Sequence, residues 1–194
     1  MYNTLILPYL SYCITIWGNT YNCYTNRIVI LQKKVLRIIT FSHRLAHTTP
    51  LFSRLNILKF EHLYKYHVNI FMFNYLHNKL PICYENFFTN NTDLYEYNTR
   101  RRNDVSLVFR KLVVCRMGLK YNGPRLYNSL DKDIRNIPSI YSFKKAIRRL
   151  YTLWTNERSC SSFWYCIVMI VVVFHKMIYI IFMLLLSTLH KREI

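Results

Sequence analysis

Residues 26–40, with the sequence NRIVILQKKVLRIIT, carry the clearest helical pattern in the chain. Apolar side chains recur there at intervals of three and four residues, as one face of an α-helix requires. We expect this face to be buried, and its members are Ile28, Leu31, Val35, Ile38 and Ile39. At about 100° per residue, the cations fall on the opposite side: Arg27, Lys33, Lys34 and Arg37. The segment therefore predicts an amphipathic helix with a basic outer face.

Helical patterns also lie on both sides of this segment. Upstream, residues 4–19 indicate a mostly buried helix that bends at Pro8 and stops near Gly18. Downstream, residues 59–79 form a second helical run, which Pro81 ends. We expect one side of this run to be core: Phe60, Leu63, Tyr64, His67, Ile70, Phe71 and Asn74.

The following third of the chain alternates between loop, strand and helix signals. Residues 84–104 are polar and aperiodic, which predicts a surface loop carrying three consecutive arginines. Residues 105–121 are rich in β-branched side chains and favour two short strands. Residues 122–138 predict a short helix with Pro124 in its first turn.

A last helix is expected from Ser142, whose hydroxyl can cap it. Its predicted buried stripe consists of Phe143, Ile147, Leu150, Tyr151 and Trp154. Together these segments predict a mainly α fold, with a small β element and a hydrophobic C-terminal helix.

Residues 163–189, FWYCIVMIVVVFHKMIYIIFMLLLSTL, contain a single formal charge, at Lys176. The stretch exceeds the roughly 20 residues that cross a bilayer and predicts one transmembrane helix. A buried C-terminal helix, or an extension under no functional selection, is the alternative. Arg148, Arg149 and Arg158 precede the stretch and would keep the body cytoplasmic. The first ten residues lack the basic start of a signal peptide, so we expect an intracellular protein.

The charge balance points to a polyanionic partner, because 27 Lys and Arg stand against nine Asp and Glu. Basic clusters that recur in separate elements can neutralise phosphates of RNA or DNA with little sequence preference and strong salt dependence. A surface that serves only solubility is the alternative. The candidate nucleic-acid-binding residues are Lys33, Lys34, Arg37, Arg44, Arg100, Arg101, Arg102, Lys144, Lys145, Arg148 and Arg149.

The sequence lacks the motifs that independent catalysis would require. His43 and His47 have zinc-ligand spacing, yet Arg44 stands where a metalloprotease needs a glutamate. Asp131 and Asp133 point in different directions on a helical turn and favour the helix dipole rather than two-metal chemistry. The six cysteines include no C-x-x-C pair, and no glycine-rich phosphate loop occurs. We expect no catalytic residue, metal or cofactor.

Six phrases, taken in order, carry a family resemblance: LILPYLSYCITIWGNTY, LQKKVLRIIT, AHTTPLFSRLNILKFEHLYKY, YNTRRR, NGPRLYNSL and SFKKAIRRL. They resemble the C-terminal portion of LINE-type, jockey-like non-LTR retrotransposon reverse transcriptases, over about residues 3–152. In that family this portion comprises the thumb and the segment beyond it. The resemblance implies that Lys33, Lys34 and Arg37 lie near the path of template and primer.

The family's RNA-directed DNA polymerase activity needs two adjacent aspartates, and this sequence has no Asp-Asp pair. The resemblance thus implies a non-catalytic remnant, with a helical thumb-like region at 1–57 and a helical and β region of the same module at 58–156. Composition adds a hydrophobic tail at 157–194, which has no counterpart in the family. An alternative function is that of a membrane-anchored basic protein, whose body lies against anionic lipid.

Overall fold

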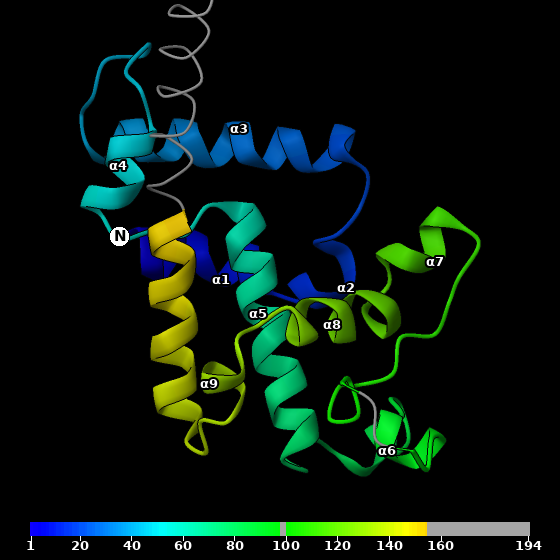
Figure 1. The fold of residues 1–194 in the computed structure, drawn as a ribbon. Helices are drawn as coiled ribbons and strands as arrows, with labels where there is room; N and C mark the ends of the chain where they lie inside the picture. The colour runs from blue at the N-terminus through cyan, green and yellow to red at the C-terminus, as the bar shows by residue number, and fades with distance from the viewer. Residues whose placement is uncertain (98–99, 155–194) are drawn as a thin grey trace, which may run out of the picture. The chain divides into compact units, whose positions relative to one another are not determined.

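A computed structural model describes residues 1–97 and 100–154 of the chain (Figure 1). The expected tail at 157–194, with its transmembrane segment at 163–189, lies outside the described residues. Among the residues that are described, no helix combines the length and the apolar character that a membrane crossing needs. Met1–Leu153 form one compact unit.

The described chain is mainly helical, which confirms the predicted fold class (Figure 1). A final helix covers residues 140–154. The elements before it are, in chain order, the π-helix η1 (Tyr2–Ile6), α1 (Leu7–Ser11), α2 (Ile14–Trp17), α3 (Asn22–Ile39), α4 (Thr49–Arg54), α5 (Phe60–Leu76), the 3-10 helix η2 (Ile82–Tyr84), α6 (Asn91–Leu94), α7 (Val113–Met117), α8 (Leu119–Asn128) and α9 (Lys132–Arg135).

The predicted pair of strands at 105–121 is wrong. Across residues 1–97 and 100–154, β pairing is limited to one antiparallel bridge between Asn90 and Val105, and α7 occupies part of the expected strand. The side chain of Asn128 occupies the edge of Val105 that faces away from Asn90, because the bridge itself uses the backbone of Asp104 and Ser106. Its Nδ2 donates to the Val105 carbonyl at 2.8 Å, and its Oδ1 accepts the Val105 N–H at 3.2 Å. One amide thus satisfies both backbone groups that a neighbouring strand would otherwise pair.

Helix α5 is the centre of the main core. The single buried stripe expected for this helix was too narrow, because buried side chains lie on several of its sides. The buried residues of α5 are Phe60, His62, Leu63, Tyr64, Val68, Asn69, Met72 and Phe73. α8 approaches α5 closely at Gly123, where an added Cβ would lie 2.9 Å from the Met72 Sδ. α8 begins at Leu119, which packs on this core. Pro124 consequently lies inside α8, whereas the sequence predicted it in the first turn of the helix.

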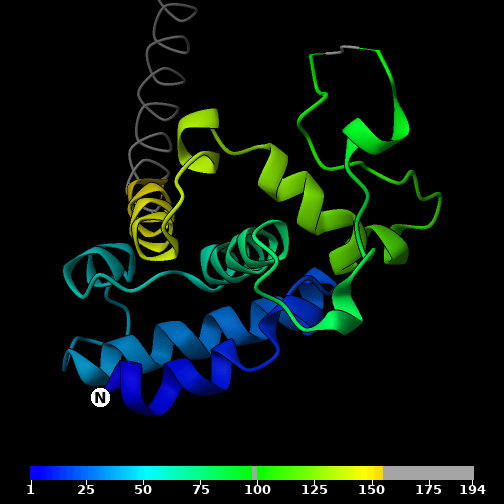
Figure 2. The same ribbon diagram turned by 90° about the horizontal axis from the view of Figure 1, so that it is seen from below.

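Helix α3 covers the expected segment but is rotated from the expected orientation. Its fully buried residues are Gln32 and Leu36. Leu31 and Ile38, predicted to be core, are 59% and 71% exposed. Leu36 joins Tyr2 and Phe52 in a second, smaller core between the N-terminal segment, α3 and α4. Figure 2 shows α1 and α3 running side by side along this core.

The rotation of α3 follows from the hydrogen bonds of Gln32, a residue that is 2% exposed. Its Nε2 donates to the Leu58 carbonyl at 2.9 Å and to the Tyr2 hydroxyl at 2.8 Å. Its Oε1 accepts the N–H of Phe60, the first residue of α5, at 3.0 Å. The side chain of Lys59, the residue before α5, makes no capping hydrogen bond. Gln32 instead supplies a partner for one of the first-turn amides of α5, which have no partner within the helix.

The N-terminal segment differs from the single bent, mostly buried helix that was predicted. Pro8 lies in the first turn of α1, where its missing N–H is harmless. The chain breaks instead after α1, because Cys13 adopts a left-handed conformation with φ 49°. Tyr2 and Ile14 are buried, whereas Tyr9 is 83% exposed. This segment therefore contributes two anchors to the cores and leaves several of its apolar side chains at the surface.

Helix 140–154 buries the predicted residues Phe143, Ile147 and Tyr151. Two details of the prediction are wrong: Trp154 is 42% exposed, and Ser142 lies within the helix instead of capping it. The Tyr151 hydroxyl accepts a hydrogen bond from Nδ2 of the fully buried Asn69 at 2.7 Å. This bond ties the helix to α5.

Replacing Gln32 by alanine should lower the free energy of unfolding of the full chain by about 2 to 4 kcal/mol. The change leaves the buried Phe60 N–H, the Leu58 carbonyl and the Tyr2 hydroxyl without their shared partner. Urea unfolding measures the effect. Lys34→Ala, an exposed change on the same helix, is the matched control and should stay within about 0.5 kcal/mol. Equal effects of the two substitutions would contradict the role given to Gln32.

The stability of the chain should fall between pH 10 and about 12. Burial raises the pKa of Tyr151 from 10.0 to about 12, although its hydrogen bond with Asn69 opposes the shift. Above pH 10 the unfolded chain loses this proton first, so unfolding is favoured by up to about 2 to 3 kcal/mol from this residue. Tyr151→Phe should flatten this part of the pH profile, as measured by urea unfolding. A profile unchanged by the substitution would show that Tyr151 titrates normally.

Candidate nucleic-acid interface

Acidic side chains are confined to one part of the described chain. Residues 1–60 contain no Asp or Glu, and residues 134–156 also lack acids. The acids of the described chain all lie between these two stretches: Glu61, Glu85, Asp93, Glu96, Asp104, Asp131 and Asp133. Cations in α3, α4 and helix 140–154 therefore have no acidic neighbours in their own segments.

The two acid-free stretches meet in space. Figures 1 and 2 both place α4 between the C-terminal end of α3 and helix 140–154. Directly after α4, the Asn56 carbonyl accepts a hydrogen bond from Arg148 Nη2 at 3.2 Å. An open hollow of about 480 Å³ lies here, lined by Asn56, Lys145, Arg148, Arg149, Thr152 and Leu153. Cations but no acids border this hollow.

The predicted cations of α3 lie on its outward side. Lys34 is exposed, and Lys33 and Arg37 are half-buried. Arg37 has a structural contact as well, because its Nε donates to the Ala46 carbonyl at 3.1 Å. This bond holds the 41–47 loop, on which Arg44 is exposed.

Apolar side chains share this outward side, contrary to the predicted separation of basic and apolar faces. Leu31 and Ile38 lie among the cations of α3, and Phe41 and Leu45 of the following loop are 97% and 80% exposed. Because Gln32 and Leu36 occupy the inward positions, the apolar residues one or two positions away turn to solvent. The face is therefore basic and acid-free, but not purely polar.

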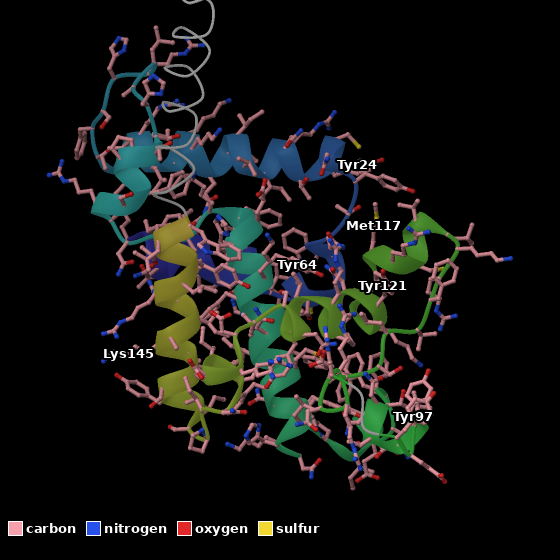
Figure 3. All side chains as sticks on the ribbon, viewed as in Figure 1. Tyr24, Tyr64, Tyr97, Met117, Tyr121 and Lys145 are labelled. Atoms are coloured by element: carbon pink, nitrogen blue, oxygen red, sulfur yellow. The ribbon has the colours of Figure 1, made fainter. Side chains whose placement is uncertain are left out.

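Helix 140–154 presents four exposed cations away from its buried stripe: Lys144, Lys145, Arg148 and Arg149. In Figure 3 the labelled Lys145 extends away from the body of the unit. We call the cations of α3, the 41–47 loop and this helix the basic face. Its members are Lys33, Lys34, Arg37, Arg44, Lys144, Lys145, Arg148 and Arg149.

The arginine triple does not join the basic face. Arg100 and Arg101 are exposed and Arg102 is half-buried, in the loop that follows α6. Both ribbon views place this loop at the far end of the unit from α3 and helix 140–154 (Figures 1 and 2). The candidate cations thus form two separate groups.

A half-buried histidine senses the positive charge of helix 140–154. His67 of α5 is half-buried. Burial lowers its pKa from the usual 6.5, and the positive charge of Lys144 lowers the pKa further. The neighbouring Tyr66 has a pKa raised by burial, and the charge of Arg148 opposes that rise. Helix 140–154 therefore acts electrostatically on α5 beneath it.

The histidine and aspartate pairs weighed as metal ligands lie in the 41–47 loop and at the start of α9. Within the described part of the chain, no group of three His, Cys, Asp or Glu is arranged to hold a metal ion. His43 and His47 flank Arg44 in the 41–47 loop, and His43 Nδ1 accepts the Leu45 N–H at 3.3 Å. Asp131 is the N-cap residue of α9 and Asp133 lies in its first turn, where each favours the helix dipole.

A second hollow was missed by sequence reasoning. It has a volume of about 460 Å³ and lies between the segment Gly18–Asn26, the start of α5 and α8. Asparagine and threonine side chains supply most of its polar groups. The run GNTYNCYTN at 18–26 was the available signal, since most of its residues are Asn or Thr. Only the fold, however, brings Asn122 and Arg125 of α8 to the same place.

Comparison of the chain with protein-family models, with curated proteins and with solved structures finds no match. A function for the chain therefore rests on the geometry and charge of the basic face, together with the resemblance carried by the six sequence phrases.

Binding of a polyanion to the basic face should raise the pKa of His67. Negative charge near Lys144 offsets the cation that helps to depress this pKa. Titration of the His67 ring by NMR, with and without heparin, measures the shift. Lys144→Gln should raise the pKa of His67 in the absence of ligand and reduce the heparin effect. If heparin left His67 unaffected but still bound, it would bind away from helix 140–154.

Proposed function

We propose that this chain binds the phosphate backbone of RNA or DNA through the basic face and catalyses no reaction by itself. One observation carries the proposal: two acid-free stretches, distant in sequence, meet where Arg148 Nη2 donates to the Asn56 carbonyl, so the cations of the basic face have no acidic neighbours in either stretch. Neutralisation of phosphates releases condensed counterions and provides most of the sequence-independent affinity for nucleic acid.

The charges of the basic face are available for an external anion. None of its cations has an acidic partner among residues 1–97 and 100–154. By contrast, Arg135 pairs with Asp104 at 2.7 Å, outside this face. Cations without acidic partners repel one another within the folded unit, and a bound polyanion lowers this repulsion.

The dimensions of the face suit a helical backbone. α3 has 18 residues and is about 27 Å long. Successive phosphates of one duplex strand are about 3.4 Å apart along the axis, so several can lie against α3 and helix 140–154 together. Arg37 holds the 41–47 loop in place through its bond to Ala46, and Arg148 holds helix 140–154 through its bond to Asn56. The exposed cations of the basic face remain available to reach toward the phosphates.

The resemblance to LINE-type reverse transcriptases supports the same proposal. It implies that Lys33, Lys34 and Arg37 lie along a template and primer path. The absence of an Asp-Asp pair leaves the chain without the carboxylates of that polymerase centre. We infer a non-catalytic remnant of an RNA-directed DNA polymerase that retains a nucleic-acid-holding module.

Binding of a labelled RNA or DNA duplex should weaken steeply with salt. If every cation of the basic face contributes, the slope of log K against log salt reaches about −7. The quadruple variant Lys33→Gln, Lys34→Gln, Lys145→Gln and Arg149→Gln should reduce the magnitude of this slope by about 3 to 4. These side chains make no hydrogen bond with the described part of the chain, so the circular dichroism spectrum should not change.

The matched control changes the same number of charges elsewhere: Arg100→Gln, Arg101→Gln, Arg110→Gln and Lys111→Gln, all exposed. It should reduce the slope by clearly less than the first variant does. Equal losses would show that net charge, and not the basic face, governs binding. Binding that does not respond to salt would contradict the proposal altogether.

The alternative of a membrane-anchored basic protein rests on residues 163–189, whose composition suits a transmembrane helix. In that case the basic face contacts anionic lipid headgroups. The two functions differ for the full chain in detergent. An anchor without a nucleic-acid role predicts that the quadruple variant and its control bind duplex equally weakly, and that the chain resists alkaline extraction from membranes.

A further inference from the structure

The 41–47 loop of the basic face begins with an aromatic side chain in an unusual backbone conformation. The N–H of Phe41 donates to the Ile38 carbonyl at 3.2 Å, and the N–H of Ser42 donates to the Arg37 carbonyl at 3.0 Å. These two bonds form a Schellman motif at the C-terminal end of α3. The motif requires a left-handed residue, and Phe41 has a φ of 51° there. Figure 1 shows the loop beyond this end of α3 and away from α5.

Glycine is the usual residue at such a position, because a Cβ makes the left-handed conformation unfavourable. Of the other four non-glycine residues with positive φ in the described chain, three are asparagine, which tolerates this conformation. Burial does not offset the strain of Phe41, since its side chain is 97% exposed. Strain without packing motivates a role for the ring in contacts outside the folded unit.

The loop that carries this ring is held in place before a partner binds. Arg37 Nε donates to the Ala46 carbonyl at 3.1 Å, and the Ala46 N–H donates to the His43 carbonyl at 2.9 Å. The hydroxyls of Thr40 and Ser42 share a hydrogen bond of 2.7 Å. A restrained loop loses less conformational freedom on binding, which favours affinity.

A cation and apolar side chains accompany the ring in the same segment. Arg44 is exposed and follows Phe41 by three residues, so their Cα atoms are at most about 11 Å apart. That distance spans only a few phosphates of a strand, which in a duplex are about 3.4 Å apart along the axis. Ile38 and Leu45 are 71% and 80% exposed, and residues 1–60 contain no acid. A strand with a phosphate against Arg44 therefore has bases within reach of the Phe41 ring.

We propose that Phe41 stacks on an unpaired base of the bound nucleic acid, so that the basic face prefers a duplex with a single-stranded segment to a perfect duplex. This inference rests on the proposed function and adds a base contact to its phosphate contacts. Every base has a flat face, so stacking on an aromatic ring tolerates any sequence. Inside a perfect duplex, neighbouring pairs cover both faces of each base, and opening that stack to admit a ring costs free energy.

Binding titrations of the full chain with three probes test the proposal: a blunt duplex, the same duplex with a short single-stranded tail, and the tailed duplex with abasic sites throughout its tail. The abasic tail keeps every phosphate but has no base to stack on. The chain should bind the base-containing tail about tenfold more tightly than the abasic tail, as the strength of base–aromatic stacking predicts. Phe41→Ala and Phe41→Leu should abolish this preference and keep the salt slope of the blunt duplex. Phe41→Trp should retain the preference.

Two further variants separate this role from a structural one. Phe41→Gly suits the left-handed position, so its midpoint of urea unfolding should be no lower than that of the wild type, while the preference for the base-containing tail is lost. Phe109→Ala removes a phenylalanine that is 75% exposed outside the basic face, and should leave the preference unchanged. A lower midpoint in Phe41→Gly would assign the ring to folding and overturn the proposal.

Equal binding of the two tails by the wild type would overturn the stacking role, and so would a preference that survives in Phe41→Ala. Steeply salt-dependent binding of the blunt duplex would leave the proposed function standing in both cases. Equal weakening of all three probes in Phe41→Ala would show that the ring inserts between paired bases instead. If Phe41→Ala weakened only binding to phosphatidylserine vesicles, the ring would serve a lipid surface and not a base. A chain that binds none of the three probes would remove both proposals.

Discussion

The hydrogen bonds of the buried Gln32 side chain join three segments of the chain. One amide binds the Tyr2 hydroxyl, the Leu58 carbonyl and the Phe60 N–H, so the N-terminal segment, α3 and the start of α5 share a single polar centre. A buried amide with three satisfied bonds tolerates little rotation, because any turn of the helix leaves polar groups unpaired in the core. The rotational position of α3, and with it the identity of its outer side chains, depends on this centre.

The orientation of α3 decides what the protein can present to a partner. With Gln32 and Leu36 inward, the cations of α3 point outward, and Arg37 fixes the loop that carries Arg44. The distribution of acids matters for this face. Helix 140–154, in the second acid-free stretch, lies beside α4, which belongs to the first. The exposed Leu31, Ile38 and Phe41 add apolar area to the same side. Such a face suits a polyanion whose sugars and bases also contact the protein.

The spacing of apolar residues located the longer helices well, but it predicted poorly which side of α3 is buried. Apolar residues at helical spacing located α3, but the pattern favoured Leu31 as core because a buried glutamine carries no hydrophobic signal. The prediction at 105–121 failed for a related reason, because β-branched residues form strands only where a partner strand exists, and the side chain of Asn128 takes that partner's place. The separation of Arg100–Arg102 from the other cations, and the convergence of Asn122 with the segment 18–26, depend on tertiary packing and leave no mark in local sequence.

Hydroxyl-radical footprinting of the full chain, with and without a bound duplex, tests most directly whether α3 is oriented as described and presents its outer face to nucleic acid. We predict that Leu31 and Ile38 are modified in the free protein and protected in the complex, whereas Leu36, which is 0% exposed, stays protected in both. Modification of Leu36 together with protection of Leu31 and Ile38 in the free protein would contradict the orientation. Unchanged modification of Leu31 and Ile38 in the complex would contradict the interface.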